Sequence, residues 1–403
     1  MTSTAVQPAF QAASKKLQFA SWPFFDFEEI EAASAVLRSG KVNYWTGEEG
    51  RQFEVEFAEF CGAKHAVCLA NGTLALELAL QAMGIGAGDE VITTSRTFIA
   101  SASCVVMRGA RPVCVDVDRD SQNITAETIE NAITPRTKAI IAVHLAGWPC
   151  DMDSILALAA ANNLKVIEDC AQAQGATYNN RPVGSMGDAA AFSFCQDKIM
   201  TTAGEGGMLV TNDSALWERA WSFKDHGKNY QAVRQANHGG GFRWLHDSFG
   251  TNWRMTEVQS AIGRIALRKI MDWVQRRRAN AAVLTKAFSR LSALRLASPD
   301  ANIEHAYYKY YAFVRPERLR RNWSRDRIMA AIVEKGVPCF SGSCSEIYLE
   351  KAFPAEWRPD CSFSVAKELG ETSLMFLVHP TLSTSDMQEM TKVVTDVMNE
   401  ATA

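Results

Sequence analysis

The sequence lacks the features that mark membrane, secreted and nucleic-acid-binding proteins. No apolar run approaches the ~18–20 residues of a membrane-spanning helix. The N-terminal stretch through Phe19 has no basic start followed by an apolar segment, so it is not a secretory signal. The net charge is −3, from 42 basic and 45 acidic residues, which is not the strongly basic footprint of a nucleic-acid binder. We therefore expect neither a membrane nor a nucleic acid as a partner.

Cysteine pairs with metal-site spacing are also missing. The chain has ten cysteines, no two of them spaced C-x-x-C, and most stand within apolar stretches. A long chain without a secretory signal typically keeps such residues as reduced thiols. We expect core thiols, a cytoplasmic protein and no metal site.

The composition is that of a folded protein. Of the 403 residues, 47% are hydrophobic and 22% are charged, which excludes disorder and low-complexity architecture. The length allows ~2–3 domains, or one large domain with an appendage.

Short β-rich runs alternate with helical stretches between Asn71 and Val210, which predicts βαβ units and a largely parallel sheet. The runs are residues 90–94, 112–116, 139–144, 164–168, 189–194 and 208–211.

A long helix is predicted from Thr256, its N-cap, to about Leu291, because this stretch has helical periodicity and no proline. It joins a large N-terminal domain to a smaller C-terminal one, and Ser383–Ala403 predicts a terminal amphipathic helix. The predicted division is a tail over 1–20, a large domain over 21–265, and the connecting helix with the small domain over 266–403. Arg276–Arg278 on the long helix reads as a solvated face or as a site for a substrate phosphate.

Three features of the α/β region carry chemistry. The turn Asn71-Gly72-Thr73 opens a helix, and its free N–H groups make either an anion site or an ordinary capped start. Asp169 follows a strand, where ligands bind in open α/β sheets, although loop caps are common there too. Lys198 stands between an apolar strand and a glycine-rich turn. Shielding from water lowers a lysine's pKa and frees its amine for Schiff-base formation, but a plain surface lysine is the alternative.

The order and spacing of these features resemble a pyridoxal-phosphate (PLP) enzyme of the aspartate aminotransferase fold. The chain is also similar to the DegT/StrS family of nucleotide-sugar aminotransferases, strongly from Phe24 to Gly263 and weakly beyond. The similar segments are GDEVITTSRTF, RPVCVDVD, ITPRTKAIIAVHLAG, IEDCAQAQGATYNNRPVGSMGDAAAFSF, DKIMTTAGEGGML and NWRMTEVQSAIG. The resemblance implies fold type I, an α/β fold with a mostly parallel central sheet flanked by helices and a smaller C-terminal α+β domain.

The resemblance also implies roles at the cofactor ring. Lys198 matches the lysine that forms the Schiff base and moves the proton between cofactor and substrate. Asp169 matches the carboxylate that pairs with the pyridine nitrogen and so favours the protonated ring, the better electron sink. Gln172 matches the residue that hydrogen-bonds the ring oxygen, and Phe98 the aromatic residue that stacks on the ring.

At the other end of the cofactor, Gly72, Thr73 and Ser193 match the phosphate-binding groups. Asn252 matches a residue that reaches the phosphate from a partner subunit, which implies a homodimer with shared active sites.

The implied reaction moves an amino group, with L-glutamate as the expected donor, to the keto sugar of a nucleotide-linked sugar for amino-sugar or polysaccharide biosynthesis. The candidates for substrate contact are His144, Arg254, His305 and Tyr307, with packing as the alternative for the histidines and the tyrosine. Two stretches, Gly336–Tyr348 and Phe376–Pro380, depart from common family patterns and leave the sugar open.

Three alternatives stay open beside this reading. A sugar dehydratase of the same family carries His in place of the lysine, which argues against that chemistry here. A keto-cyclitol aminotransferase is not separated by motif. A PLP-binding regulator without turnover needs an added sensor or DNA-binding module, for which we expect no room before Phe24 or after Ser383.

Overall fold

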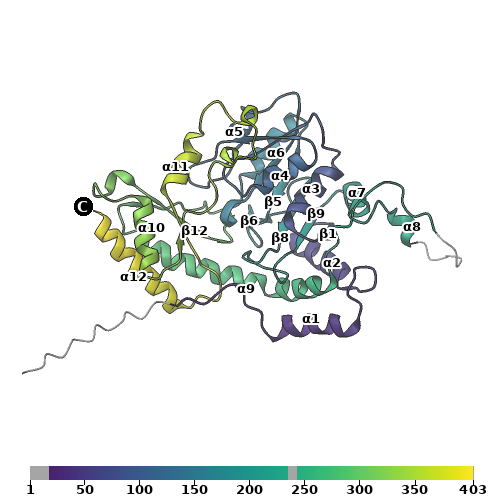
Figure 1. Ribbon diagram of the computed structural model, residues 1–403, viewed down its shortest axis with the longest axis horizontal. Coiled ribbons are helices and arrows are strands. Elements are labelled where there is room, and N and C mark those ends of the chain that lie inside the picture. The colour runs from purple at the N-terminus through teal and green to yellow at the C-terminus, as the bar shows by residue number, and fades with distance from the viewer. Residues whose placement is uncertain (1–17, 235–242, 403) are drawn as a thin grey trace, which may run out of the picture.

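A seven-stranded sheet forms the centre of the protein in a computed structural model that describes residues 18–234 and 243–402 (Figure 1). The strand order is β1-β9-β8-β5-β4-β2-β3, and β9 is the one strand of this sheet that runs opposite to the other six. The strands are β1 (His65–Leu69), β2 (Glu90–Thr94), β3 (Arg111–Val115), β4 (Thr137–Val143), β5 (Lys165–Asp169), β8 (Ala189–Ser193) and β9 (Gly207–Thr211). The predicted α/β fold with a mostly parallel sheet is confirmed. The pattern missed β1 and placed the other strands within one or two residues.

Helices cover both faces of this sheet, because its strands present apolar side chains alternately to each side. In β1, Val67 and Leu69 pack with α3, α4 and α7, whereas Ala66 and Cys68 pack with α2 and α9. The helices around the sheet are α1 (Phe27–Ser39), α2 (Glu49–Cys61), α3 (Gly72–Ala82), α4 (Ala100–Met107), α5 (Ala126–Glu130), α6 (Met152–Ala161), α7 (Ser214–Lys224) and α8 (Tyr230–Arg234).

The long helix α9 (Glu257–Phe288) runs beneath the large sheet and on to a second, smaller sheet (Figure 1). It starts as predicted, because Thr256 and Gln259 form a capping box. The predicted boundary at residue 265 falls inside α9, and the division into domains stays a prediction. Residues 1–17 of the predicted tail lie outside the described part of the chain.

The second sheet is antiparallel, with the order β10-β12-β14-β13. The predicted terminal helix is present as α12, which packs into the apolar core of this region together with α9 and α10. The elements of this region are β10 (Leu294–Arg295), β11 (Ile303–Glu304), β12 (Tyr310–Val314), α10 (Arg325–Glu334), β13 (Cys339–Phe340), α11 (Ser364–Thr372), β14 (Ser373–Phe376) and α12 (Thr384–Ala401).

Backbone contacts hold the two regions together. The strand β11 pairs with β6 (Thr177–Tyr178), which in turn pairs with β7 (Arg181–Pro182). Close by, the N–H groups of Ala306 and Tyr308 donate to the carbonyls of Gly147 and Ala146, at 2.9 and 2.8 Å. The short 3-10 turns of the chain are η1 (Leu145–Gly147), η2 (Pro316–Arg318), η3 (Ile347–Leu349) and η4 (Ala355–Trp357).

All ten cysteines are free thiols. Cys344 and Cys361 are exposed, however, so the expectation of core thiols is wrong for these two. Both stand in loops of the smaller region, outside its helices and strands. Of the helices in the described ranges, none is long and apolar enough to cross a membrane.

Candidate active site

The carboxylate of Asp169 ends β5 and lies buried at the carboxyl edge of the sheet. The hydroxyl of Ser101 donates to its Oδ2 at 2.9 Å, and the N–H of Ala171 donates to its Oδ1 at 3.1 Å. Burial raises the pKa of Asp169, although these two hydrogen bonds and the charge of Lys198 oppose the rise. A carboxylate held this way is suited to pair with a buried cation, such as a protonated ring nitrogen.

Lys198 follows β8, the strand next to β5, and its side chain is half-buried. Its Nζ lies 4.9 Å from the ring centroid of Tyr308. Among the residues that the structure describes, this Nζ has no hydrogen-bond acceptor. The indole Nε1 of Trp22 donates to the backbone carbonyl of Lys198 at 2.8 Å. The lysine backbone is therefore held while its amine stays free to react.

The N-terminus of α3 meets the end of β8. Asn71 caps the helix by accepting from the N–H of Leu74 at 3.0 Å. Within the described ranges, the N–H groups of Gly72 and Thr73 have no acceptor. A Cβ on Gly72 would lie 2.6 Å from that of Ser193, so only glycine lets the two segments approach this closely.

This arrangement fits a phosphate. Two free N–H groups, the positive end of the helix dipole and the hydroxyl of Ser193 all lie at one point. Together with the buried Asp169 and the free amine of Lys198, the site has donors for a phosphate, a partner for a ring nitrogen and an amine for a carbonyl. The residues present therefore fit pyridoxal phosphate.

Gln172 stands three residues after Asp169, and Phe98 stands three residues before Ser101, which donates to the Asp169 carboxylate. Gln172 accepts from the N–H of Ala146 at 2.8 Å through Oε1, which directs its amide Nε2 elsewhere as a donor. Ala146 has a left-handed backbone, φ 58°, although it is not glycine, and such strain is typical of functional sites. Phe98 is 68% exposed and stands just before α4, the helix that carries Ser101. Its ring is open for stacking.

The four predicted substrate residues contact other residues of the chain in this structure, and substrate contact by Arg254, His305 and Tyr307 stays a prediction. His144 is fully buried: its Nδ1 accepts from the N–H of Cys150 at 2.9 Å, and its Nε2 lies 3.1 Å from Glu168. Both ring nitrogens are used inside the fold, which leaves neither for a sugar. His144, Glu168 and Cys170 lie close enough together for a metal ion, but both Glu168 oxygens already accept backbone N–H groups.

His305 and Tyr307 stack on each other, with ring centroids 3.9 Å apart. The Nδ1 of His305 accepts from the N–H of Tyr307 at 2.7 Å, and burial lowers the pKa of this histidine to about 3. The pair is therefore neutral, and in this structure the two rings pack together.

Arg254 pairs with the buried Asp225, at 2.7 Å. The side chain of Asn252 is exposed. Its segment adjoins Leu69 and Ala70, just before the phosphate turn of its own chain. Arg254 and Asn252 therefore stand near the start of α3 of their own chain. That Asn252 reaches the cofactor phosphate of a partner subunit stays a prediction.

Sequence patterns missed residues that come from distant segments. Ser101, Trp22, Tyr308 and Lys309 all contact or adjoin the site, and only Ser101 stands near a motif. The expected solvated face at Arg276–Arg278 is wrong for Arg277, which is 1% exposed. The residue lies on the side of α9 that packs against the smaller region, where its Nη1 donates to the Tyr308 carbonyl at 3.1 Å.

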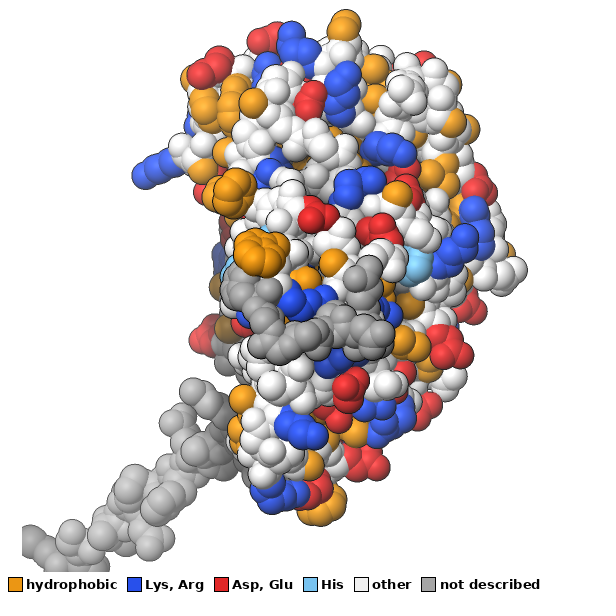
Figure 2. Space-filling view, turned by 90° about the vertical axis from the view of Figure 1, so that its right-hand side faces the viewer, with side chains coloured by type: hydrophobic (Ala, Val, Ile, Leu, Met, Phe, Trp, Pro, Cys, Tyr) orange, Lys and Arg blue, Asp and Glu red, His pale blue; other side chains and the backbone are white. Residues whose placement is uncertain are grey.

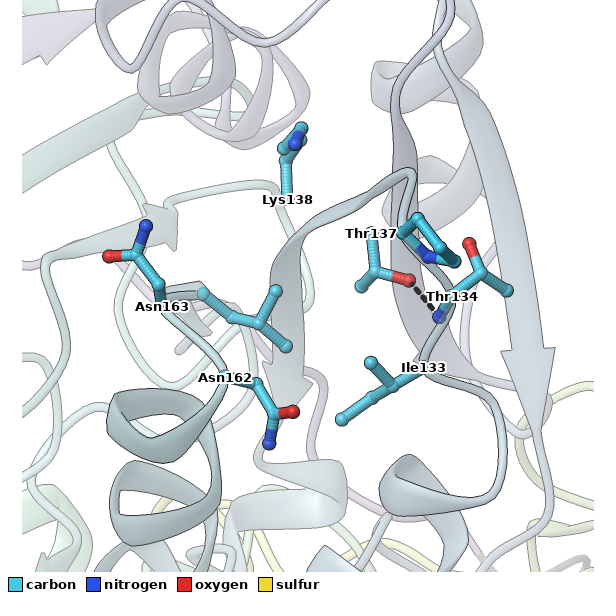
Figure 3. Close-up of a pocket in the computed structure, with 8 residues that line it drawn as sticks. Ile133, Thr134, Thr137, Lys138, Asn162 and Asn163 are labelled. Atoms are coloured by element: carbon cyan, nitrogen blue, oxygen red, sulfur yellow. Dashed lines mark hydrogen bonds between the residues drawn. The ribbon is translucent and has the colours of Figure 1, made fainter.

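A pocket of about 410 Å³ lies at the opposite end of the sheet (Figure 3). Lys138, Asn162 and Asn163 line it where β4 and β5 begin, whereas Asp169 stands where β5 ends. It is separate from the site described above.

The fold and this site define an aminotransferase that depends on pyridoxal phosphate. The model of the DegT/DnrJ/EryC1/StrS aminotransferase family matches residues 24–395. The chain therefore belongs to this family, which confirms the resemblance found in the sequence.

Individual relatives agree with this assignment. An aminotransferase from Psychrobacter cryohalolentis has a solved structure that covers 95% of this chain and all of its own, with a TM-score of 0.94 and 55% identity. GDP-perosamine synthase of Caulobacter vibrioides is 44% identical over 298 residues, 71% of this chain and 77% of its own length. The spore coat polysaccharide biosynthesis protein SpsC of Bacillus subtilis is 34% identical over 382 residues, 94% of this chain and 97% of its own length.

Proposed function

We propose that this protein binds pyridoxal phosphate and moves an amino group to the keto sugar of a nucleotide-linked sugar. The observation that carries the proposal is the convergence of three groups at one sheet edge. These are the buried Asp169 carboxylate, the free amine of Lys198, and the donors of α3 and Ser193.

The N–H groups of Gly72 and Thr73 and the hydroxyl of Ser193 would hold the phosphate. Asp169 would keep a proton on the ring nitrogen, and Ser101 fixes the orientation of the Asp169 carboxylate. Bound there, pyridoxal phosphate supplies an electron sink for the electron pair released when a C–H bond next to the reacting nitrogen breaks. With the cofactor bound, Phe98 would cover the ring and Gln172 would donate from Nε2 to the ring oxygen.

Lys198 removes and returns the proton of that C–H bond at its Nζ. General acid–base catalysis of this kind requires that the amine reach the reacting carbon without competing contacts. The free Nζ beside Tyr308, on a backbone held by Trp22, meets that requirement.

The relatives support a sugar as the acceptor. GDP-perosamine synthase and the spore coat polysaccharide protein SpsC both bear names that point to sugar chemistry. We take L-glutamate as the amino donor. The presence of Lys198 disfavours the dehydratase alternative, since those family members carry His at this position.

We also propose a homodimer that works in the cytoplasm. Phe249 is 99% exposed in the segment that precedes Asn252, and Figure 2, which faces that end of the molecule, shows apolar side chains beside the grey atoms. A second copy of the chain would cover this surface, and light scattering of the purified protein tests the dimer. The ten free thiols support a reducing compartment.

An absorption spectrum before and after L-glutamate tests the function. We expect a yellow protein that glutamate bleaches and a keto sugar nucleotide restores. A protein that cannot be loaded with pyridoxal phosphate contradicts the whole proposal. A yellow protein that does not respond to glutamate but responds to another amine would support the cofactor assignment and replace glutamate as the donor.

A further inference from the structure

Arg277 carries a buried positive charge without an acidic partner. It is 1% exposed, and in the described ranges its Nε and Nη2 have no hydrogen-bond partner. Its guanidinium lies 5.3 Å from the ring centroid of Trp22, the residue that donates to the Lys198 carbonyl. A buried charge without a partner lowers the stability of the fold. The presence of Arg277 beside the active site therefore suggests a functional role.

A second cation lies in the same cluster. Lys309 Nζ is 4.5 Å from the ring centroid of Tyr308, the ring that Lys198 Nζ approaches to 4.9 Å. The two amines therefore lie over the same ring. Lys309 is mostly buried, and burial together with Arg277 and Lys198 lowers its pKa to about 8.

One carboxylate faces these two cations. Asp197 accepts from the Tyr308 hydroxyl and lies 3.7 Å from Lys309 Nζ, which is beyond hydrogen-bond distance. Among the residues that the structure describes, no carboxylate lies within ion-pair distance of Arg277. The charge of Lys198 acts on both Asp169 and Asp197. Three cations, Lys198, Lys309 and Arg277, therefore stand against two carboxylates, and one bound anion would balance the positive charge in excess.

We propose that Lys309 binds the carboxylate of the amino donor, with Arg277 as a positioning residue behind it. This inference rests on the proposed aminotransferase function. Arg277 acts through its Nη1 bond to the Tyr308 carbonyl, which fixes the backbone next to Lys309, and through its charge. Asp197, whose side chain is 54% exposed, can turn away when the donor enters.

The position of the cluster favours a carboxylate over the diphosphate of the sugar nucleotide. In an α-amino acid the carboxylate is attached to the carbon that carries the amine, so it must bind close to the reacting lysine. In a nucleotide sugar the diphosphate is separated from a keto carbon by part of the sugar ring. Lys309 shares the Tyr308 ring with Lys198 and so occupies the nearer place.

Equilibrium binding of glutarate to the cofactor-loaded protein tests the proposal, because this dicarboxylate has no amine and cannot react. Lys309→Met should weaken glutarate at least about tenfold, the loss expected for one charge-assisted hydrogen bond. Lys309→Arg should restore most of the affinity. Lys138→Met, at the exposed lysine of the far pocket, is the matched control and should change nothing.

Kinetics and a second probe give independent readings. Lys309→Met should raise KM for glutamate about tenfold and leave KM for the keto sugar nucleotide unchanged. Binding of inorganic pyrophosphate should not change. Lys309→Gln gives the same comparison if Met disturbs the packing, with the melting temperature as the check on folding.

Three results would overturn the proposal. They are no glutarate binding to the wild type, unchanged glutarate binding in folded Lys309 variants, and a loss of affinity that is confined to pyrophosphate. Bleaching of the wild type by glutamate is measured first. Its absence contradicts the proposed function, whereas bleaching together with unchanged glutarate binding in the variants contradicts only this inference.

Discussion

Two neighbouring carboxylates at the end of β5 face opposite sides of the sheet and behave in opposite ways. Glu168 and Asp169 are both buried, and burial favours the neutral form of each. Glu168 nevertheless has a lowered pKa, because His144 and the N–H groups of Gly184 and Gly187 outweigh burial. Asp169 has a raised pKa, because its hydrogen bonds with Ser101 and Ala171 do not outweigh burial.

The difference shows which of the two serves the chemistry. Glu168 is saturated with donors and fixes the loop at residues 184–187, so it has no capacity left for a ligand. Asp169 is left short of partners and retains the capacity to pair with a cation. Of these two adjacent buried acids, the one that receives fewer hydrogen bonds from the fold is the one that can bind a ligand.

Replacing the reactive amine of Lys198 should have the largest effect. Lys198→Ala should lower turnover by at least about 10⁴-fold, since it removes both the reactive amine and the proton carrier. The melting temperature should stay close to that of the wild type, because Nζ makes no hydrogen bond in the described structure. Turnover with both substrates is the measurement, Lys138→Ala is the control, and retained activity would contradict the assignment.

Replacing Asp169, the carboxylate that we assign to the active site, should have the second-largest effect. Asp169→Asn should lower turnover by about 10³-fold while the protein still takes up cofactor, because the phosphate has its own anchors. Cofactor content from absorbance and turnover per loaded site separate the two effects. Unchanged turnover at full loading would remove Asp169 from the mechanism.

Its structural neighbour should respond in stability instead. Glu168→Gln replaces an oxygen by an amide that cannot accept the backbone N–H groups, and we expect it to lower the free energy of unfolding by about 2–4 kcal/mol. Turnover per folded, loaded molecule should change little. Denaturant unfolding measures the loss. If instead turnover falls as far as in Asp169→Asn, the contrast between the two acids is wrong.

The phosphate end offers a smaller test. Gly72→Ala introduces a Cβ 2.6 Å from that of Ser193, which pushes the helix start away from β8. We expect the dissociation constant for pyridoxal phosphate to rise about tenfold. Equilibrium dialysis measures this constant. Gly86→Ala is the matched control, because its Cβ would lie 3.4 Å from the nearest atom. Gly84→Ala is not suitable as a control because Gly84 has a positive φ.

The smallest effect concerns the cofactor-free protein. Because the folded pKa of Asp169 is raised, its ionisation reduces stability as the pH rises above the unfolded value of about 3.9. Glu168 behaves in the reverse way and loses its stabilising effect as the pH falls through its lowered folded pKa. Asp169→Asn without cofactor should therefore be about 1 kcal/mol more stable than the wild type at pH 7. Melting curves from pH 4 to 8 should show the gap closing toward acid, and a constant gap would contradict the raised pKa.

Sequence reasoning succeeded where function depends on short segments. The turn at Asn71, the strand ending in Asp169 and the lysine after β8 are each local patterns, and the parallel sheet brings strand ends together. It failed for Arg277 and Lys309, because the face that a helical arginine buries depends on packing with distant residues. It left His144 open between packing and substrate contact, since a histidine after a strand gives no sign that both its nitrogens are occupied.

The bond from Trp22 to the Lys198 carbonyl has a consequence for how the molecule is made. Trp22 is synthesised long before Trp273 of α9 and His379, yet its ring packs against the first and stacks on the second. The large sheet can form while synthesis continues. The support behind the reactive lysine is completed only after residues up to His379 have been translated, so a nascent enzyme carries Asp169 and Lys198 before it can hold them in place.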